Sequence, residues 1–386
     1  MTDIRPVQHL NYLIKPASGL CNMRCRYCFY EDETEKRSTP NAGIMTAQTS
    51  EALVRDTFAA LNANGSVSFA FQGGEPTLAG EAYFEYFTDL VRRYNTRHVP
   101  VSYVLQTNGY RLDASWAELF VREKFLVGIS MDGNRAVHDS LRVDAAGAAT
   151  WDRIQKNLAM MQEKGVELNI LCVVTKRCAK NPERVYRSLK DLGVRYLQFI
   201  PCLDPLGEPR GSLPWSLVPE DYGHFLCGLF DAWYQDWSTG EYTSVRLFDD
   251  YVHMAMGQAP GTCATSGSCG SYLVAEADGS LYPCDFYCLD EWKLGEIGEK
   301  AIPELLYGEK ERRFLSLGQQ HPSACGRCPW VRLCYGGCRR DWMQDSAGNH
   351  NYYCSAFRRF FEYAAPRITQ IAGEELRLQR RNAGRT

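Results

Sequence analysis

One stretch decides the fold: Cys21-Asn22-Met23-Arg24-Cys25-Arg26-Tyr27-Cys28, which follows the short apolar run Leu13-Ile14. A loop this tight can aim three thiolates at one metal centre but cannot supply a fourth. Thiolates select zinc, copper(I) or iron–sulfur clusters, and a structural zinc site needs four protein ligands. A cluster held by three cysteines keeps one iron open for another ligand. A zinc site that borrows a remote ligand, or a chance cluster of cysteines, is the alternative interpretation.

The composition is that of an ordinary soluble protein with one large domain or two. The chain has 386 residues, of which 45% are hydrophobic, and a net charge of -3. This charge gives no electrostatic reason to expect nucleic acid or an anionic membrane as partner. There is no apolar run of about eighteen residues and no signal-peptide pattern at the N-terminus, so we expect a cytoplasmic protein. Sixteen cysteines in such a chain indicate metal binding, not disulfides.

From about residue 10 to 235, short apolar runs alternate with amphipathic stretches, which predicts a parallel sheet covered by helices. The predicted strands are Asn11–Lys15, Ser66–Gln72, Val101–Gln106, Phe125–Ser130, Leu168–Thr175 and Tyr196–Pro201. The predicted helices include Ala47–Ala63, Ala82–Tyr94, Trp116–Glu123, Trp151–Lys164 and Pro182–Leu192. The fold class is therefore α/β, a partial (β/α)6 TIM-like barrel, with an open doubly wound sheet as the alternative. Right-handed crossovers place the loops that follow the strands, including the cysteine loop, on one face.

Polar or glycine-rich segments follow several of these strands. Gln72-Gly73-Gly74-Glu75-Pro76-Thr77 follows the second, and paired glycines let a backbone approach a ligand closely, although such a motif alone is most often a turn. Ser130 ends the fourth strand, and Arg142 lies further along. Its planar guanidinium suits a carboxylate, although a solvated surface charge is the alternative. Leu203 follows the sixth strand.

A second set of cysteines begins after the predicted barrel, and we divide the chain into residues 1–235 and 236–386 on that basis. The set consists of Cys263, Cys269, Cys284, Cys325, Cys328, Cys334, Cys338 and Cys354. Eight thiols suffice for two fully ligated 4Fe–4S clusters, and a pair of zinc ribbons is the alternative. Five further cysteines receive no chemical role: Cys172, Cys178, Cys202, Cys227 and Cys288.

Asp285 directly follows Cys284. A carboxylate beside a cluster ligand is unusual, because neighbouring thiolates raise the cost of its charge. It is either a turn residue that accepts hydrogen bonds from nearby backbone, or a general base that faces the substrate. The sequence alone leaves both interpretations open.

The cysteine loop resembles the signature of the radical S-adenosylmethionine (SAM) enzymes, and the second cysteine set resembles the SPASM domain. The whole chain resembles the anaerobic sulfatase-maturating enzymes, most narrowly in Leu105-Gln106-Thr107-Asn108-Gly109 and Cys284-Asp285-Phe286-Tyr287. This resemblance implies that a radical generated from SAM oxidises a cysteine or serine of a sulfatase to Cα-formylglycine, within a Cys/Ser-x-Pro/Ala-x-Arg-like segment. It also implies three 4Fe–4S clusters and an electron donor such as flavodoxin or ferredoxin.

The same resemblance implies roles for single residues. Cys21, Cys25 and Cys28 would hold the SAM cluster. An auxiliary cluster near the active site would be held by Cys263, Cys269, Cys284 and Cys338, and an outer one by Cys325, Cys328, Cys334 and Cys354. The implied SAM contacts are Tyr27, Gly73, Gly74, Glu75, Ser130, Arg142 and Leu203. The implied substrate contacts are Tyr30, Gln72 and Gln106, and Asp285 becomes the general base.

Two other functions fit parts of the pattern. A SPASM maturase that cross-links or epimerises a ribosomally made peptide would use the same fold and clusters. A non-enzymatic iron–sulfur or zinc protein would need neither a three-cysteine loop with an open iron nor the Gly73-Gly74-Glu75 segment.

Overall fold

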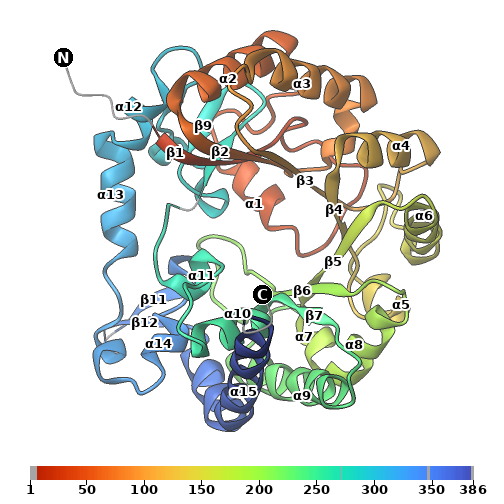
Figure 1. Ribbon diagram of the computed structural model, residues 1–386, viewed down its shortest axis with the longest axis vertical. Coiled ribbons are helices and arrows are strands. Elements are labelled where there is room, and N and C mark those ends of the chain that lie inside the picture. The colour runs from red at the N-terminus through yellow and green to blue at the C-terminus, as the bar shows by residue number, and fades with distance from the viewer. Residues whose placement is uncertain (1–6, 271, 346–347, 384–386) are drawn as a thin grey trace.

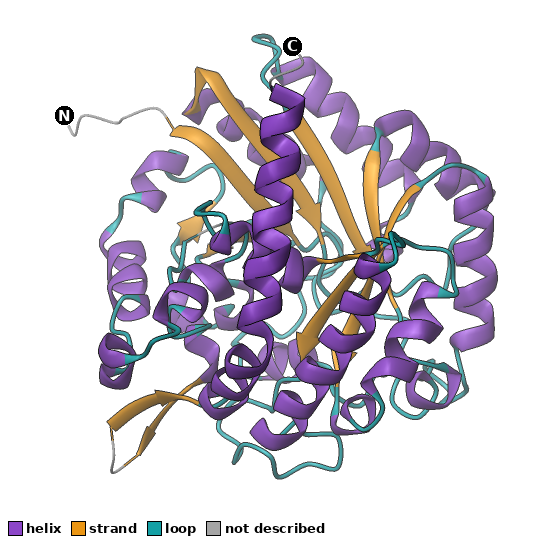
Figure 2. Cartoon of the chain, turned by 60° about the horizontal axis from the view of Figure 1, so that its bottom comes forward, coloured by secondary structure: helices purple, strands orange, loops and turns teal. Residues whose placement is uncertain are grey.

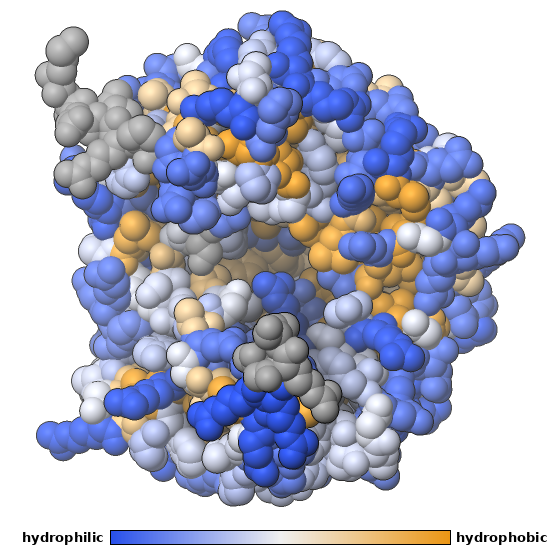
Figure 3. Space-filling view, in the orientation of Figure 1, coloured by the Kyte–Doolittle hydropathy of each residue, from blue (hydrophilic) through white to orange (hydrophobic). Residues whose placement is uncertain are grey.

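The computed structural model describes residues 7–270, 272–345 and 348–383. Its centre is a ten-stranded sheet with the order β10-β9-β8-β1-β2-β3-β4-β5-β6-β7, which bends into an open arc with helices on its outer side (Figure 1). The parallel strands are β1 (Val7–Ile14), β2 (Leu61–Phe71), β3 (Val101–Thr107), β4 (Phe125–Ser130), β5 (Glu167–Val174), β6 (Tyr196–Pro201) and β7 (Ser244–Val245). Figure 3 shows this face of the molecule hollowed at its centre, inside the arc.

The six predicted strands are confirmed, and β4 and β6 have the predicted bounds. The first two strands begin earlier than predicted, at Val7 and Leu61. The helix predicted to end at Ala63 therefore ends at Ala60, because the chain enters β2 directly. The alternation of apolar strands with amphipathic helices thus predicts the number and order of these elements better than their ends.

The outer helices are α2 (Ala47–Ala60), α3 (Glu81–Tyr94), α4 (Ala114–Glu123), α6 (Trp151–Glu163), α8 (Pro182–Lys190) and α9 (Pro219–Ser238). Aromatic side chains fill the space between α3 and the strands. Phe71 packs edge-on against Phe84 and Phe87, with ring centroids 5.0 and 5.1 Å apart. Within the described residues, no helix combines the length and the apolarity that crossing a bilayer requires.

A short helix that the sequence does not predict, α1 (Phe29–Glu35), begins directly after the cysteine loop. It lies inside the arc of strands, not on its outer side (Figure 1). Seven residues are too few for a clear helical period, so the pattern gives no signal for it.

The second half of the chain extends the sheet at its first strand. The added strands are β8 (Leu273–Ala275), parallel to β1, and then β9 (Ser280–Tyr282) and β10 (Gly295–Glu296), both antiparallel. Two further elements stand outside the sheet: the hairpin of β11 (Trp342–Asp345) and β12 (Gly348–Asn351), and the long helix α15 (Cys354–Ala383), which packs against α9 (Figure 2). The division between residues 235 and 236 stays a prediction.

Candidate functional site

The three-cysteine loop is held at the C-terminal end of β1 by backbone hydrogen bonds to a distant segment. The Arg24 N–H donates to the Val143 carbonyl at 2.8 Å, and the Arg26 N–H donates to the Leu141 carbonyl at 3.0 Å. The bonds come from every second residue, as they do between paired strands. They therefore hold the backbone of the cysteine loop in place. Cys21, Cys25 and Cys28 are all partly exposed.

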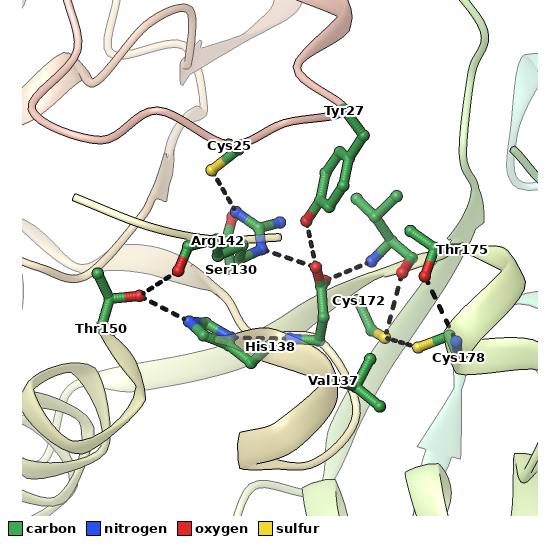
Figure 4. A network of polar contacts seen from close by, with 12 residues as sticks. Cys25, Tyr27, Ser130, Val137, His138, Arg142, Thr150, Cys172, Thr175 and Cys178 are labelled. Carbon is green, nitrogen blue, oxygen red and sulfur yellow. Dashed lines mark hydrogen bonds and ion pairs between the residues drawn. The ribbon is translucent and has the colours of Figure 1, made fainter. Parts of the chain in front are cut away.

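Asp132, which follows β4, joins this loop to the sheet (Figure 4). One carboxylate oxygen accepts a hydrogen bond from the Tyr27 hydroxyl and lies 3.0 Å from Nε of Arg142. The other accepts the Val173 N–H at 2.8 Å. Burial by itself disfavours the charged guanidinium, but the Asp132 carboxylate outweighs it and the pKa of Arg142 is raised well above its usual value. A permanent cation is thereby held with Nη1 3.9 Å from Sγ of Cys25.

His138, on the short helix α5 (Arg135–His138), contacts the backbone of Asp132 and the side chain of Thr150 (Figure 4). Its Nδ1 accepts the Asp132 N–H at 3.2 Å, and its Nε2 lies 3.0 Å from the Thr150 hydroxyl. That hydroxyl donates its own proton to the Arg142 carbonyl at 2.9 Å, so Nε2 must be the donor to Thr150. The network therefore assigns a neutral imidazole with its proton on Nε2.

Acid should loosen this support. Burial lowers the pKa of His138 to about 4, from an ordinary value of 6.5. The folded state thus binds fewer protons than the unfolded one. The stability that the neutral ring contributes is present above pH 6.5 and is lost as the pH falls towards 4. The difference between the two pKa values corresponds to about 3 kcal/mol of the free energy of unfolding. Denaturant unfolding between pH 7 and 4 should show this loss, and a His138→Gln variant should show a flatter pH dependence. An unchanged slope in the variant would mean that His138 is not the group responsible.

The segment Gly73-Gly74-Glu75 lies against the residues that precede the cysteine loop. The Gly74 N–H donates to the Ser18 carbonyl at 2.8 Å, and the Glu75 N–H donates to the Leu20 carbonyl at 2.7 Å. A Cβ on Gly74 would stand 2.0 Å from the Leu20 carbonyl oxygen, closer than any real contact. Glycine is therefore required here for two backbones to meet, in addition to any approach to a ligand.

The side chain of Glu75 is completely buried and is used within the protein. One carboxylate oxygen accepts the hydroxyls of Thr77 and Thr107, each at 2.7 Å, and the other accepts the Asn108 N–H at 2.7 Å. Asn108 in turn places its side-chain amide 3.7 Å from Sγ of Cys21. Glu75 thus links the ends of β2 and β3 to the cysteine loop, and its contact with SAM stays a prediction.

We expect Gly74→Ala to disrupt the site without a change of charge. The added methyl group would push residues 18–20 and the cysteine loop away, so the variant should lose SAM binding and much of the iron of this site. Iron analysis and SAM titration by calorimetry measure both. Gly373→Ala in α15 is the matched control, because there a Cβ meets only the tip of Arg377 at 3.7 Å and alanine favours a helix. Normal SAM binding by Gly74→Ala would contradict the packing argument.

Asp285 lies in a second buried polar cluster, which α1 and β1 form with the residues after β8. Lys15 is the first residue after β1. Its Nζ lies 2.5 Å from an Asp285 carboxylate oxygen and 3.4 Å from the centre of the Tyr30 ring. The Tyr30 hydroxyl donates to Glu276, which also pairs with Arg37 at 2.6 Å. Burial opposes the charge of Lys15, but the Asp285 carboxylate outweighs it and raises the pKa of Lys15 well above its usual value.

The environment of Asp285 distinguishes the two interpretations of this residue. It begins the 3-10 turn η2 (Asp285–Tyr287), yet its carboxylate is buried against a cation, and its Oδ1 has no hydrogen-bond partner within the described residues. A carboxylate in an ion pair is a proton acceptor only, as a general base must be. The ion pair with Lys15 gives the turn interpretation no support, and the role of general base stays a prediction.

Glu33 is a member of this cluster that the sequence does not single out. It stands three residues after Tyr30 on α1, on the same helix face. Both of its carboxylate oxygens are buried without a hydrogen-bond partner in the described part of the chain. Burial raises the pKa of Glu33 to about 8, even though Lys15 acts in the opposite direction. Glu33 is therefore predominantly protonated at neutral pH.

Replacing Glu33 by glutamine should stabilise the protein at alkaline pH. The folded state binds the Glu33 proton more tightly than the unfolded state, so stability falls as the pH rises from about 4.5 to 8. Each unit of the difference is worth roughly 1.4 kcal/mol, and an amide has no such dependence. We expect Glu33→Gln to raise the melting temperature more at pH 8.5 than at pH 5, as differential scanning fluorimetry would detect. Equal shifts at both values would exclude the titration of Glu33 as their cause.

The remaining predicted contacts lie at, just before or just after the C-terminal ends of parallel strands. The Gln106 amide donates to the Ser130 hydroxyl at 2.9 Å, which joins a predicted substrate contact to a predicted SAM contact. The Gln72 N–H donates to the Ile14 carbonyl at 2.9 Å and keeps β2 in register with β1. Leu203 is half-buried just after β6. Binding of SAM or substrate by these residues stays a prediction.

The eight later cysteines gather at two cavities. One is lined by Cys263, Cys269, Cys284 and Cys338. The other, of about 220 Å³, is lined by Cys325, Cys328, Cys334 and Cys354. These are the two groups that the resemblance assigns to two clusters, and every cysteine is a free thiol. No three Cys, His, Asp or Glu side chains of the described residues converge closely enough for a single ion. Four thiols around a cavity instead suit a larger, multi-iron group.

The cysteines without an assigned role are mostly small core residues. Cys172 and Cys202 are buried, as their apolar strand contexts predict. Sγ of Cys172 lies 3.8 Å from Sγ of Cys178 (Figure 4). Cys288 is buried beside the Cys284 carbonyl, at 3.6 Å.

Comparisons with known proteins agree with this arrangement. Residues 16–189 match the model of the radical SAM superfamily, and residues 268–329 match that of an iron–sulfur cluster-binding domain. The chain is 44% identical over 366 residues to a cysteine-type anaerobic sulfatase-maturating enzyme of Clostridium perfringens, covering 94% of this chain and 98% of that one. A serine-type anaerobic sulfatase-maturating enzyme of Klebsiella aerogenes is 33% identical, with 90% and 84% covered.

A solved structure is also similar over almost the whole chain. It is that of native anSMEcpe with bound AdoMet and Cp18Cys peptide, with a TM-score of 0.89 and 42% sequence identity. The match covers 95% of this chain and 99% of that one.

Proposed function

Because this chain belongs to the anaerobic sulfatase-maturating enzymes of the radical SAM superfamily, we propose that Cys21, Cys25 and Cys28 hold the cluster that binds SAM. The protein is an oxidoreductase that converts a cysteine or serine of a sulfatase-derived segment to Cα-formylglycine. The peptide cross-linking or epimerising alternative is not favoured, since the relatives that span nine-tenths of the chain are named sulfatase-maturating enzymes.

We propose cysteine as the preferred target. The cysteine-type relative is 44% identical and the serine-type relative 33% identical. The substrate would be a polypeptide with a Cys-x-Pro/Ala-x-Arg-like segment, and the reductant a flavodoxin or ferredoxin. The two cavities lined by four cysteines each would hold the auxiliary 4Fe–4S clusters.

When bound, SAM and the clusters supply the 5′-deoxyadenosyl radical that removes hydrogen from the target Cβ and the acceptor for the remaining electron. The chain's own residues position the groups and move the proton. Asp285 accepts the proton of the substrate thiol, and Lys15 orients its carboxylate for that transfer. Arg142 and Asp132 fix the cysteine loop and present a cation beside it.

The observation that carries this proposal is the Lys15–Asp285 ion pair directly beside Cys284. It places a carboxylate, held in one orientation by Lys15, next to Cys284, one of the four cysteines that line the first auxiliary cavity. A buried ion pair often stabilises a protein no more than a pair of apolar residues would. Stability alone therefore does not explain why a lysine and an aspartate lie at this place.

Paired peptides test the substrate. The anaerobically reconstituted enzyme, with SAM and reductant, would be given Cys-x-Pro-x-Arg and Ser-x-Pro-x-Arg peptides of otherwise identical sequence. Mass spectrometry after hydrazine trapping should show an aldehyde, mainly from the cysteine peptide. A larger yield from the serine peptide would reverse the preference. Formation of 5′-deoxyadenosine with both peptides unchanged would contradict the proposed substrate while leaving SAM cleavage in place.

A further inference from the structure

A groove of about 580 Å³ lies on the surface beside β4 and β5, outside the site described above. It is formed by α5, the short helix α7 (Lys176–Ala179) and the first turn of α8. Four of its side chains are cations: Lys176, Arg177, Lys180 and Arg184. We call this surface the cationic groove. No carboxylate is found among the described residues that line it.

The four cations of the cationic groove are exposed, and Lys180 and Arg184 also line an adjoining groove that contains Glu183 and Asp231. None of the four has an ion pair or a side-chain hydrogen bond within residues 7–270, 272–345 and 348–383. Some other surface cations pair with carboxylates, such as Arg92 with Glu123 at 2.7 Å and Arg122 with Glu85 at 2.8 Å. The neighbouring Glu183 is directed to Arg187, 3.9 Å away. In a chain with a net charge of -3, four free cations in one concavity form a local field that attracts acidic surfaces.

The inner wall of the cationic groove is connected to the three-cysteine loop through a short chain of contacts (Figure 4). Val137 lines the groove, and the next residue, His138, accepts the Asp132 N–H at 3.2 Å. Asp132 holds Arg142 at 3.0 Å, and Arg142 reaches Sγ of Cys25 at 3.9 Å. The two sulfur cavities of the second half are lined by other residues altogether. Of the three proposed cluster sites, the groove is thus linked to that of Cys25.

We infer that the cationic groove docks an acidic one-electron carrier protein, which reduces the cluster held by Cys21, Cys25 and Cys28. This inference rests on the proposed function, because that function requires an electron at this loop. A protein surface suits the groove better than a small anion, since the four exposed cations are spread over α7, the residue that follows it and α8. A carrier that docks there would lie on the opposite side of Val137 from the three-cysteine loop. The four exposed cations would increase the rate at which the two proteins associate more than they would increase the affinity of the complex.

The test separates delivery of the electron from the chemistry that uses it. The rate of 5′-deoxyadenosine formation would be measured with reduced flavodoxin at sub-saturating concentration and, separately, with dithionite, which needs no docking site. Lys176→Glu/Lys180→Glu should lower the flavodoxin-driven rate on the order of tenfold at low salt, raise the KM for flavodoxin and leave the dithionite-driven rate unchanged. Added salt should slow the wild type and bring it close to the variant.

Two further variants make the result decisive. Arg177→Ala/Arg184→Ala removes charge from the same groove without reversing it and should give a smaller loss in the same direction. Arg380→Glu/Arg381→Glu, in the exposed last turn of α15, has the same charge change at a remote place and should leave both rates unchanged. The proposal is overturned if only the α15 variant lowers the flavodoxin-driven rate. It is also overturned if the groove variants lower the dithionite-driven rate as much as the flavodoxin-driven rate, or if they change only the KM for a sulfatase substrate. Failure to modify either peptide would instead concern the proposed function, because 5′-deoxyadenosine is measured independently of it.

Discussion

Asp285→Asn should lower formylglycine formation by about 10²- to 10⁴-fold, which is the usual contribution of a positioned general base. The amide has nearly the same shape as the carboxylate but cannot accept the substrate proton at neutral pH. SAM cleavage should continue at close to the normal rate, because the Asp132–Arg142 network and the cysteine loop do not include Asp285. The loss should therefore appear as uncoupling, with 5′-deoxyadenosine formed in excess over aldehyde.

Quantifying both products in one reaction, together with the iron content, checks this result. Asp290→Asn is a suitable control, since Asp290 is an exposed residue of the same region whose carboxylate accepts the Ser38 N–H at 2.9 Å. Iron must be intact in both variants, because Asp285 adjoins Cys284. Full aldehyde formation by Asp285→Asn would remove the base from this position and leave the Lys15 pair as a structural feature.

Cys25→Ala should abolish SAM cleavage altogether. Two thiols cannot hold a cluster that normally has three, so the variant should lose one cluster's worth of iron while the iron of the two later cavities is retained. Unlike Asp285→Asn, it should form neither 5′-deoxyadenosine nor aldehyde. Iron analysis, visible absorption and chromatography of the SAM products measure these effects.

Cys227→Ala is the matched control for the loss of a thiol. Cys227 is a partly exposed free cysteine on α9, outside both auxiliary cavities and the loop. We expect unchanged iron and unchanged SAM cleavage. Residual cleavage in Cys25→Ala above that of enzyme without iron would mean that this thiol does not hold the cluster.

The sequence predicts those parts of the site that depend on spacing within one segment. The three-cysteine loop, the paired glycines and the strand that precedes each of them are close together in the chain, so their pattern is visible directly. The periodicity also predicts the six strands, with β4 and β6 at their observed bounds. Bounds elsewhere differ where a helix passes into a strand without a turn, as at Ala60 and Leu61.

The rest of the site depends on contacts between residues far apart in the chain. Lys15 reads as the polar end of an apolar strand, and only the tertiary structure brings it to Asp285. Asp132 and His138 look like ordinary turn residues, because neither has a motif of its own. Glu33 lies on a helix too short to show a period, and its raised pKa arises from burial that a sequence does not contain. For these residues the only available signal is position, at the end of a strand or directly after the cysteine loop.

The pairing of β1 with β8 has a consequence for synthesis on the ribosome. Ile14 pairs with Ala275, so one edge of β1 finds its neighbour only after about 260 further residues have been made. At the usual speed of translation this delay lasts roughly ten to fifty seconds, during which the nascent chain exposes an unpaired apolar edge strand. The loop with the first three cysteines emerges from the ribosome at the start of that interval. Throughout it, Lys15 lacks its ion-pair partner Asp285. We therefore expect slow translation or a shortage of chaperones to reduce the yield of soluble protein before either affects the activity of the molecules that fold.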